Sequence, residues 1–162
     1  VWDPRRLPGR RVDFLEVERW LEQLCGGQCA NGHVRSERRP DCTPCTANAF
    51  QGAFNVVQIV YDPYQMEATA QRLRRLHLTW LWPCDQAAAR WICDSDFHKY
   101  VLTKRLAHNG DELLREHVLN ARAKLQKDED SRMRMVKKAP NRKIDAAVAA
   151  AMAVERAMYL NI

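Results

Sequence analysis

The stretch VVQIVYDPYQ, residues 56–65, decides the fold expected for this chain. Its first six residues are nearly all apolar and rich in β-branched side chains, which is typical of a central strand buried on both faces. Asp62 and a proline end the strand, and apolar residues at helical spacing follow over 64–76. A second short apolar stretch, LTWLW at 78–82, is again closed by a proline. Strand, helix and strand in this order predict a parallel pair with a right-handed crossover, and hence an α/β sheet.

The rest of the chain contributes helices, one further strand and one irregular segment. Residues 12–24 place apolar side chains on one helical face, with Asp13 and Glu16 arranged as a capping pair. Residues 131–138 alternate methionines with arginines, as a half-exposed strand would. Residues 25–52 are rich in Gly, Pro, Asn, Thr and Cys without periodicity, which indicates a loop-rich insertion. Further helices are predicted over 86–106, 111–126 and the alanine-rich segment after Asn141.

Length and charge limit the classes of protein to consider. With 162 residues, the chain is long enough for one domain with a core and too short for two, so we expect a single domain over 1–162. The formal net charge of +6 favours an anionic partner such as nucleic acid, although a solvated basic surface is the alternative. No stretch approaches the ~18 apolar residues of a membrane span, and no charged-then-apolar leader opens the chain. We therefore expect a soluble cytosolic protein with no membrane partner.

Two carboxylates are candidates for chemistry. Open α/β sheets bind ligands beyond the carboxyl ends of their strands, which is where Asp62 is expected. Asp145 falls in the first turn of the last predicted helix, and the alanines after it would let this helix lie close against a sheet. The two carboxylates could then bind Mg²⁺ or Mn²⁺, which take oxygen ligands and bridge phosphate oxygens. The alternatives are a turn-forming role for Asp62 and helix capping by Asp145.

The irregular segment over 25–52 contains two closely spaced cysteine pairs. Cys25 and Cys29 form the first pair, Cys42 and Cys45 form the second, and His33 lies between the pairs. Thiolates from two turns can hold a tetrahedral Zn²⁺, which replaces a core that such a segment lacks. We therefore predict a structural zinc held by the four cysteines, with His33 as an alternate ligand. Unrelated thiols in a mobile loop are the alternative, and disulfides are less expected in a cytosolic protein.

Three segments, in this order and spacing, resemble the C-terminal nuclease domain of the large terminase subunits of tailed bacteriophages. They are VVQIVYDPYQMEATAQRLR at 56–74, KRLAHNGDELLREHVLNARAK at 104–124 and RMRMVKKAPNRKIDAAVAAAMAVERA at 132–157. The last segment is the most specific, and the likeness covers roughly residues 12–24 and 54–160. The resemblance implies an RNase H-like mixed sheet flanked by helices. It also implies two-metal cleavage of concatemeric double-stranded DNA during genome packaging.

The resemblance further implies site residues and partners. By motif, Asp62 matches the second of the family's three metal-binding acidic residues, and Asp145 matches the third. No strand that ends in the first acidic residue precedes residues 12–24, and the family's ATPase motor is absent from the sequence, so we expect an N-terminally incomplete nuclease domain. The implied partners are double-stranded DNA, the terminase ATPase domain, the small terminase subunit and the portal, in the cytoplasm of a bacterial host. The rival hypothesis is a non-catalytic nucleic-acid-binding or assembly module, a degenerate prophage remnant with a structural zinc.

Basic and polar residues near Asp145 are candidate DNA contacts. His108, in the turn LAHNG, could contact a phosphate or place a water molecule, and a structural or solvated histidine is the alternative. Four cations that precede Asp145 could neutralise the DNA backbone, and an ordinary solvated face is the alternative. These cations are Lys137, Lys138, Arg142 and Lys143.

Overall fold

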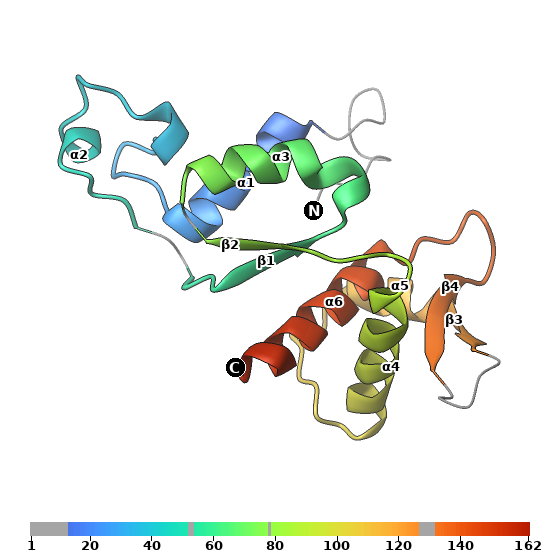
Figure 1. Ribbon diagram of the computed structural model, residues 1–162. Helices are drawn as coiled ribbons and strands as arrows, with labels where there is room; N and C mark the ends of the chain where they lie inside the picture. Colours follow the sequence, from blue (N-terminus) through green and yellow to red (C-terminus); the bar gives the residue numbers. More distant parts are fainter. Residues whose placement is uncertain (1–12, 52–53, 78, 127–131) are drawn as a thin grey trace. The chain divides into compact units, whose positions relative to one another are not determined.

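The computed structural model describes residues 13–51, 54–77, 79–126 and 132–162. The chain forms two compact units, Val1–Trp82 and Pro83–Ile162. Helices and two small sheets make up the described residues, so the fold is mixed α/β (Figure 1). The single mixed sheet expected from the sequence is instead a pair of two-stranded sheets in this part of the chain. None of the described helices is long and apolar enough to cross a membrane.

The first unit opens with helix α1, which spans Phe14–Gly26. Asp13 caps it, because its Oδ1 accepts a hydrogen bond from the Leu15 N–H at 2.9 Å. The helix ends where Gly27 adopts a φ of 74°, a left-handed conformation that glycine enters at little cost. The helix predicted over 12–24 is therefore confirmed, apart from residue 12, which lies outside the described residues.

The strand–helix–strand unit predicted around Asp62 is also present. Strand β1 spans Gln58–Tyr61, helix α3 spans Pro63–Arg75 and strand β2 spans Trp80–Pro83. The two strands are hydrogen-bonded neighbours, and their arrows point the same way in Figure 1. Helix α3 begins at a proline, whose fixed φ and missing N–H suit the first helical position.

A buried carboxylate joins α1 to α3. Glu18 accepts hydrogen bonds from the Thr69 hydroxyl at 2.9 Å and from the Arg72 guanidinium. Glu18 and Thr69 are both buried. The hydrogen bond from Arg72 is the main cause that lowers the pKa of Glu18, against the opposing effect of burial. This polar contact fixes the two helices side by side, with Leu21 and Leu73 also buried in this unit.

The second unit contains helices packed beside an antiparallel hairpin. Strands β3 and β4 pair so that Ala123 faces Met135. The strand β3 replaces the last turns of the helix predicted over 111–126, and that prediction was wrong there. The chain leaves the helix at Asn120, whose side chain donates to the Lys143 carbonyl at 3.1 Å. The bounds are α4 Ala89–Leu102, α5 Glu112–Leu119, β3 Ala121–Leu125, β4 Met133–Lys137 and α6 Asp145–Leu160.

Side chains of α4 cover the edge of β4 that faces away from β3. The Met135 N–H donates to Asp94 Oδ2 at 2.8 Å, and the Met133 N–H donates to Ser95 Oγ at 2.9 Å. Asp94 is also paired with Arg90, whose Nη2 lies 2.8 Å from Asp94 Oδ2. The unpaired N–H groups of an edge strand are thus satisfied by a helix rather than by a third strand.

Helix α6 packs against α4 and α5 within this unit. Ala147 and Ala151 are fully buried, and Met152 is buried beside them. The small side chains therefore allow a close approach, as predicted, but the partners of α6 in this unit are helices rather than a sheet. His117 of α5 is buried and accepts a hydrogen bond from the Ala146 N–H at 2.9 Å, which fixes the start of α6.

Candidate functional site

Asp62 lies at the tip of β1 and immediately before α3. Its Oδ1 accepts a hydrogen bond from the Tyr64 N–H at 3.0 Å, so the side chain caps α3. Asp62 therefore has a local role at the start of α3, and its predicted metal-binding role stays a prediction. The carboxylate remains exposed, so the cap leaves it accessible to a further ligand.

Asp145 is the first residue of α6 and is also exposed. It does not cap the helix, because Ile144 occupies the N-cap position and His117 accepts the N–H of the next residue, Ala146. Among the described residues, the Asp145 carboxylate makes no hydrogen bond or ion pair. A carboxylate that is exposed and has no partner in the described part of the chain is available for a metal ion or a cationic partner.

The two carboxylates belong to different units. Asp62 is part of the unit Val1–Trp82, and Asp145 is part of the unit Pro83–Ile162. Each of the two carboxylates is exposed at the start of a helix, Asp62 before α3 and Asp145 at the first residue of α6. The prediction that Asp62 and Asp145 share metal ions stays a prediction.

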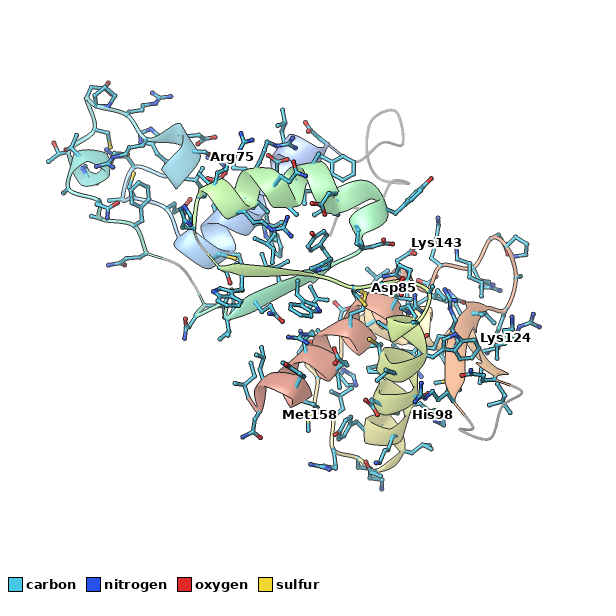
Figure 2. The ribbon with its side chains drawn as sticks, in the orientation of Figure 1. Arg75, Asp85, His98, Lys124, Lys143 and Met158 are labelled. Atoms are coloured by element: carbon cyan, nitrogen blue, oxygen red, sulfur yellow. The ribbon has the colours of Figure 1, made fainter. Side chains whose placement is uncertain are left out.

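The four predicted cations precede Asp145 in the sequence. All four are exposed, and Figure 2 labels Lys143, two residues before the helix. The Lys138 Nζ donates to the Leu119 carbonyl at 2.6 Å, and its N–H donates to the Asn120 carbonyl at 2.9 Å. The segment is thus held to the end of α5. The cations are Lys137 at the end of β4, then Lys138, Arg142 and Lys143.

His108 is exposed in the segment between α4 and α5. Its Nδ1 accepts a hydrogen bond from the Gly110 N–H at 3.0 Å, so the ring supports a local turn. Gly110 has a φ of 81°, which a side chain rarely tolerates. The alternative role of His108 as a structural residue is therefore observed, and its contact with DNA stays a prediction.

Three predicted zinc ligands and the alternate ligand lie together. The metal-binding atoms of Cys29, His33, Cys42 and Cys45 are all within 4.8 Å of one another. The three cysteines are buried and His33 is half-buried. The remaining predicted ligand, Cys25, lies on α1 and is not part of this cluster.

The cysteines of the cluster are free thiols with different electrostatic environments. The backbone N–H of Cys45 donates to the Cys42 sulfur, as does Asn31 Nδ2 at 3.3 Å, and these bonds lower the pKa of Cys42 to about 6. Burial raises the pKa of Cys45. Burial also raises the pKa of Cys25, on α1.

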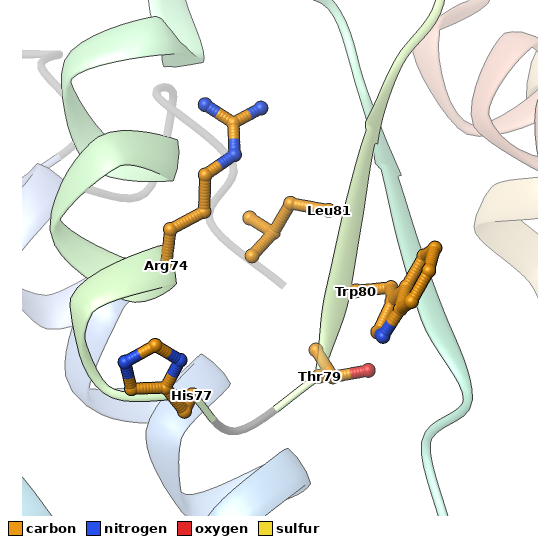
Figure 3. A pocket seen from close by; sticks show the side chains of 5 residues that line it. All are labelled: Arg74, His77, Thr79, Trp80 and Leu81. Atoms are coloured by element: carbon orange, nitrogen blue, oxygen red, sulfur yellow. The ribbon is translucent and has the colours of Figure 1, made fainter.

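A pocket that the sequence did not indicate lies between α3 and β2 (Figure 3). Arg74, His77, Thr79, Trp80 and Leu81 line it. Leu81 points toward the helix and Trp80 points to the opposite side of the strand. The Arg74 guanidinium is engaged by Glu67 at 3.2 Å and by the Tyr61 hydroxyl at 2.7 Å. The pocket contains none of the predicted site residues. The positive charge of Arg74 is already paired with Glu67.

Comparison with known proteins gives one finding. A family model described as the terminase large subunit, endonuclease domain, matches residues 41–160, which is well over half of the chain. Asp62 and Asp145 lie inside the match, whereas Cys29 and His33 precede it. No curated protein and no solved structure matches this chain.

Proposed function

The chain belongs to the family of terminase large-subunit endonuclease domains, and from this premise we propose that it cleaves concatemeric double-stranded DNA during viral genome packaging. The family itself indicates a nuclease role in DNA packaging. We propose that the fold is RNase H-like, with the β1–α3–β2 unit, the β3–β4 hairpin and α6 as its parts. The parallel neighbours β1 and β2, with a helix between them in the chain, support this assignment.

Asp62 and Asp145 are the residues proposed to hold Mg²⁺ or Mn²⁺. The donor set fits these ions, because both side chains are exposed carboxylates and hard cations take oxygen ligands. When bound, such ions supply Lewis-acid stabilisation of phosphate oxygens and a water of lowered pKa. The residue that carries the proposal is Asp145: its carboxylate is at a helix start, exposed, and used by no hydrogen bond or ion pair in the described part of the chain.

The basic residues before Asp145 are proposed to hold the DNA backbone. Lys137, Arg142 and Lys143 are exposed, and the hydrogen bonds of Lys138 tie their segment to α5. Phosphate contacts of this kind orient a duplex without reading its sequence. The proposed partners of the chain are the terminase ATPase domain, the small terminase subunit and the portal, in the bacterial cytoplasm.

The test is nicking of supercoiled plasmid by the purified chain across a titration of Mn²⁺. We expect Asp145→Asn to lower the nicking rate by at least about 100-fold, which corresponds to ~2.7 kcal/mol of transition-state stabilisation. Asp62→Asn should have a similar effect and keep the cap of α3, because the asparagine oxygen can still accept the Tyr64 N–H. Glu112→Gln is the matched control, since Glu112 is an exposed acid in the first turn of α5.

Two results would refute the proposal. One is full nicking by Asp145→Asn. The other is a wild-type chain that binds DNA, folds, and cuts at no concentration of Mn²⁺, which would favour the non-catalytic binding module instead. The Cys/His cluster is a separate candidate for a metal, and the proposal for cleavage does not depend on it.

A further inference from the structure

The Cys/His cluster lies in a closed loop that spans residues 28–51 and that we call the cysteine loop. Its two ends are joined by an antiparallel bridge in which Gln28 and Gln51 exchange backbone hydrogen bonds of 3.2 Å. Inside the loop, the chain reverses at Gly32, whose φ is 77°, and Cys29 N–H donates to the His33 carbonyl at 2.9 Å. The loop also contains the short helices η2, Arg35–Glu37, and α2, Thr43–Thr46.

Four of the six distances among the ligand atoms of the cluster are close to those of a tetrahedral zinc site, and all six are within 4.8 Å. With Zn–S near 2.3 Å and Zn–N near 2.0 Å, a tetrahedron separates two sulfurs by about 3.8 Å, and a sulfur from a nitrogen by about 3.5 Å. Cys29 Sγ lies 3.6 Å from Cys45 Sγ and 4.0 Å from Cys42 Sγ. His33 Nδ1 lies 3.4 Å from Cys45 Sγ and 3.6 Å from Cys29 Sγ. A disulfide would need sulfurs at about 2.05 Å, so these distances exclude one.

The cysteine loop has little else to hold it together. Its buried apolar cluster consists of Cys29, Cys42 and Cys45, against which the half-buried Phe50 packs. Val34 is the other fully buried apolar side chain among the loop's described residues. A loop of this length that buries so few carbon atoms does not recover the conformational entropy lost on folding. A bound metal ion supplies that missing free energy in small cysteine-rich segments.

The environment of the cluster also suits metal-bound thiolates. The Cys42 sulfur accepts hydrogen bonds from the Asn31 amide and from the Cys45 backbone N–H. Donors of this kind orient a ligating thiolate and spread its charge. Three sulfurs and one imidazole nitrogen are a soft donor set, which favours Zn²⁺ over Mg²⁺ or Mn²⁺.

The cysteine loop is fastened to α1 by polar contacts. Glu22, which is buried on α1, accepts from the Ser36 N–H at 3.1 Å and from the Ser36 hydroxyl at 2.7 Å. Arg19, one turn earlier, donates to Glu37 at 3.0 Å and to the Gly32 carbonyl at 3.3 Å. Order in the loop is therefore coupled to α1, which the Glu18 carboxylate joins to α3.

We propose that the cysteine loop binds one structural Zn²⁺ through Cys29 Sγ, His33 Nδ1, Cys42 Sγ and Cys45 Sγ, and that this ion holds the loop against α1. The site replaces the four-cysteine set predicted from spacing, since His33 takes the place of Cys25. Two of its ligands, Cys29 and His33, precede the residues matched by the family model, and the other two, Cys42 and Cys45, lie inside the match.

The experiment measures metal content and cobalt spectroscopy on the full chain. We expect one Zn²⁺ per chain after dialysis, and a Co²⁺ form with the visible bands of tetrahedral coordination and a thiolate-to-cobalt charge-transfer band. Cys45→Ser should lower zinc affinity by at least about 100-fold, because loss of a direct ligand costs no less than loss of an outer partner. Cys25→Ser is the matched control and should bind zinc as the wild type does.

If Cys45→Ser fails to fold, hydrogen exchange of the wild-type chain still tests the proposal, because it does not require the variant. Stripping the metal with a chelator should speed exchange at the hydrogen-bonded amides of Cys29, Gly32, Cys42 and Thr46. The paired strands β3 and β4 should keep their protection.

Zinc below about 0.1 per chain at a stoichiometric supply would overturn the proposal. So would an octahedral cobalt spectrum, equal losses in Cys25→Ser and Cys45→Ser, or loop amides that do not respond to the chelator. None of these readouts requires DNA cleavage, so this proposal and the proposed nuclease fail independently.

Discussion

Replacing Asp94 by asparagine removes the negative charge from a buried ion pair within α4, whose carboxylate also accepts the Met135 N–H of β4. The side chains of Arg90 and Asp94 are 6% and 0% exposed, and Arg90 Nη2 lies 2.8 Å from Asp94 Oδ2. Asparagine has nearly the same shape and keeps an oxygen that can accept from the Met135 N–H. The main change is therefore a buried guanidinium without its counter-charge, for which about 3–5 kcal/mol of lost stability is expected. The free energy of unfolding of a domain is typically ~5–15 kcal/mol, so a loss of this size should be readily measurable.

The assay is urea unfolding of the full chain, together with hydrogen exchange at the amides of β3 and β4. A double variant, Asp94→Asn with Arg90→Met, removes both charges and keeps the acceptor for Met135, so it should recover at least about 2 kcal/mol of the loss. Glu37→Gln is the control, because Arg19 and Glu37 are 47% and 44% exposed, and such pairs contribute ~1 kcal/mol or less. A loss below about 1 kcal/mol for Asp94→Asn, or a double variant no better than the single, would refute this account.

Two further predictions concern titratable groups. The pKa of Glu18 is lowered by Arg72, so this contact stabilises the fold above the ordinary glutamate pKa of 4.5, and the contribution is lost as the pH falls through the lowered value. Glu18→Gln should therefore cost about 1–3 kcal/mol at pH 7 and progressively less as the pH falls below 4.5, measured by urea unfolding over a series of pH values, and a cost that does not change with pH would contradict the assignment. Burial raises the pKa of Cys93 to about 12, so its thiol stays protonated at pH 8. Iodoacetamide at pH 8 should label the half-buried Cys25 before Cys93 in mass-spectrometric mapping, and early labelling of Cys93 would contradict its burial.

The elements that the sequence predicted well are those whose pattern is local. The apolar run before Asp62 became β1, the helical spacing after it became α3, and the methionine–arginine alternation became β4. Strand β3 was missed, because its sequence ARAKL consists of good helix formers. Its conformation is decided by pairing with β4, which is a contact between distant residues that periodicity does not report.

The contacts that position the candidate sites could not be predicted from the sequence either, because they also join residues that are distant in the chain. The His117 side chain accepts a hydrogen bond from the Ala146 N–H, 29 positions further along the chain. The Asp94 side chain accepts one from the Met135 N–H, 41 positions further along. No spacing rule marks either histidine or aspartate as a positioning residue. Ser36 and Glu22, which fasten the cysteine loop, are equally ordinary in the sequence.

The exchange of Cys25 for His33 has a local explanation. Cysteine spacing alone favoured two pairs, but α1 continues to Gly26 and keeps Cys25 on the helix. The left-handed Gly27 then turns the chain, so the first residue able to face the second pair is Cys29. The turn at Gly32 then brings His33 beside it, with Nδ1 3.6 Å from Cys29 Sγ. Backbone conformation at two glycines, rather than cysteine count, selects the four side chains of the cluster.

The two metal hypotheses concern donors of opposite character, and this separates them chemically. Asp62 and Asp145 present carboxylate oxygens on exposed helix starts, where a hard cation that keeps part of its water shell is favoured. The cysteine loop presents three sulfurs and one nitrogen that are largely withdrawn from solvent, where a cation that gives up its water for four protein ligands is favoured. We therefore expect that an excess of Mg²⁺ or Mn²⁺ will not displace zinc from the loop. A chain of hydrogen bonds links the loop to α1 through Glu22, and α1 to α3 through Glu18; Asp62 caps α3.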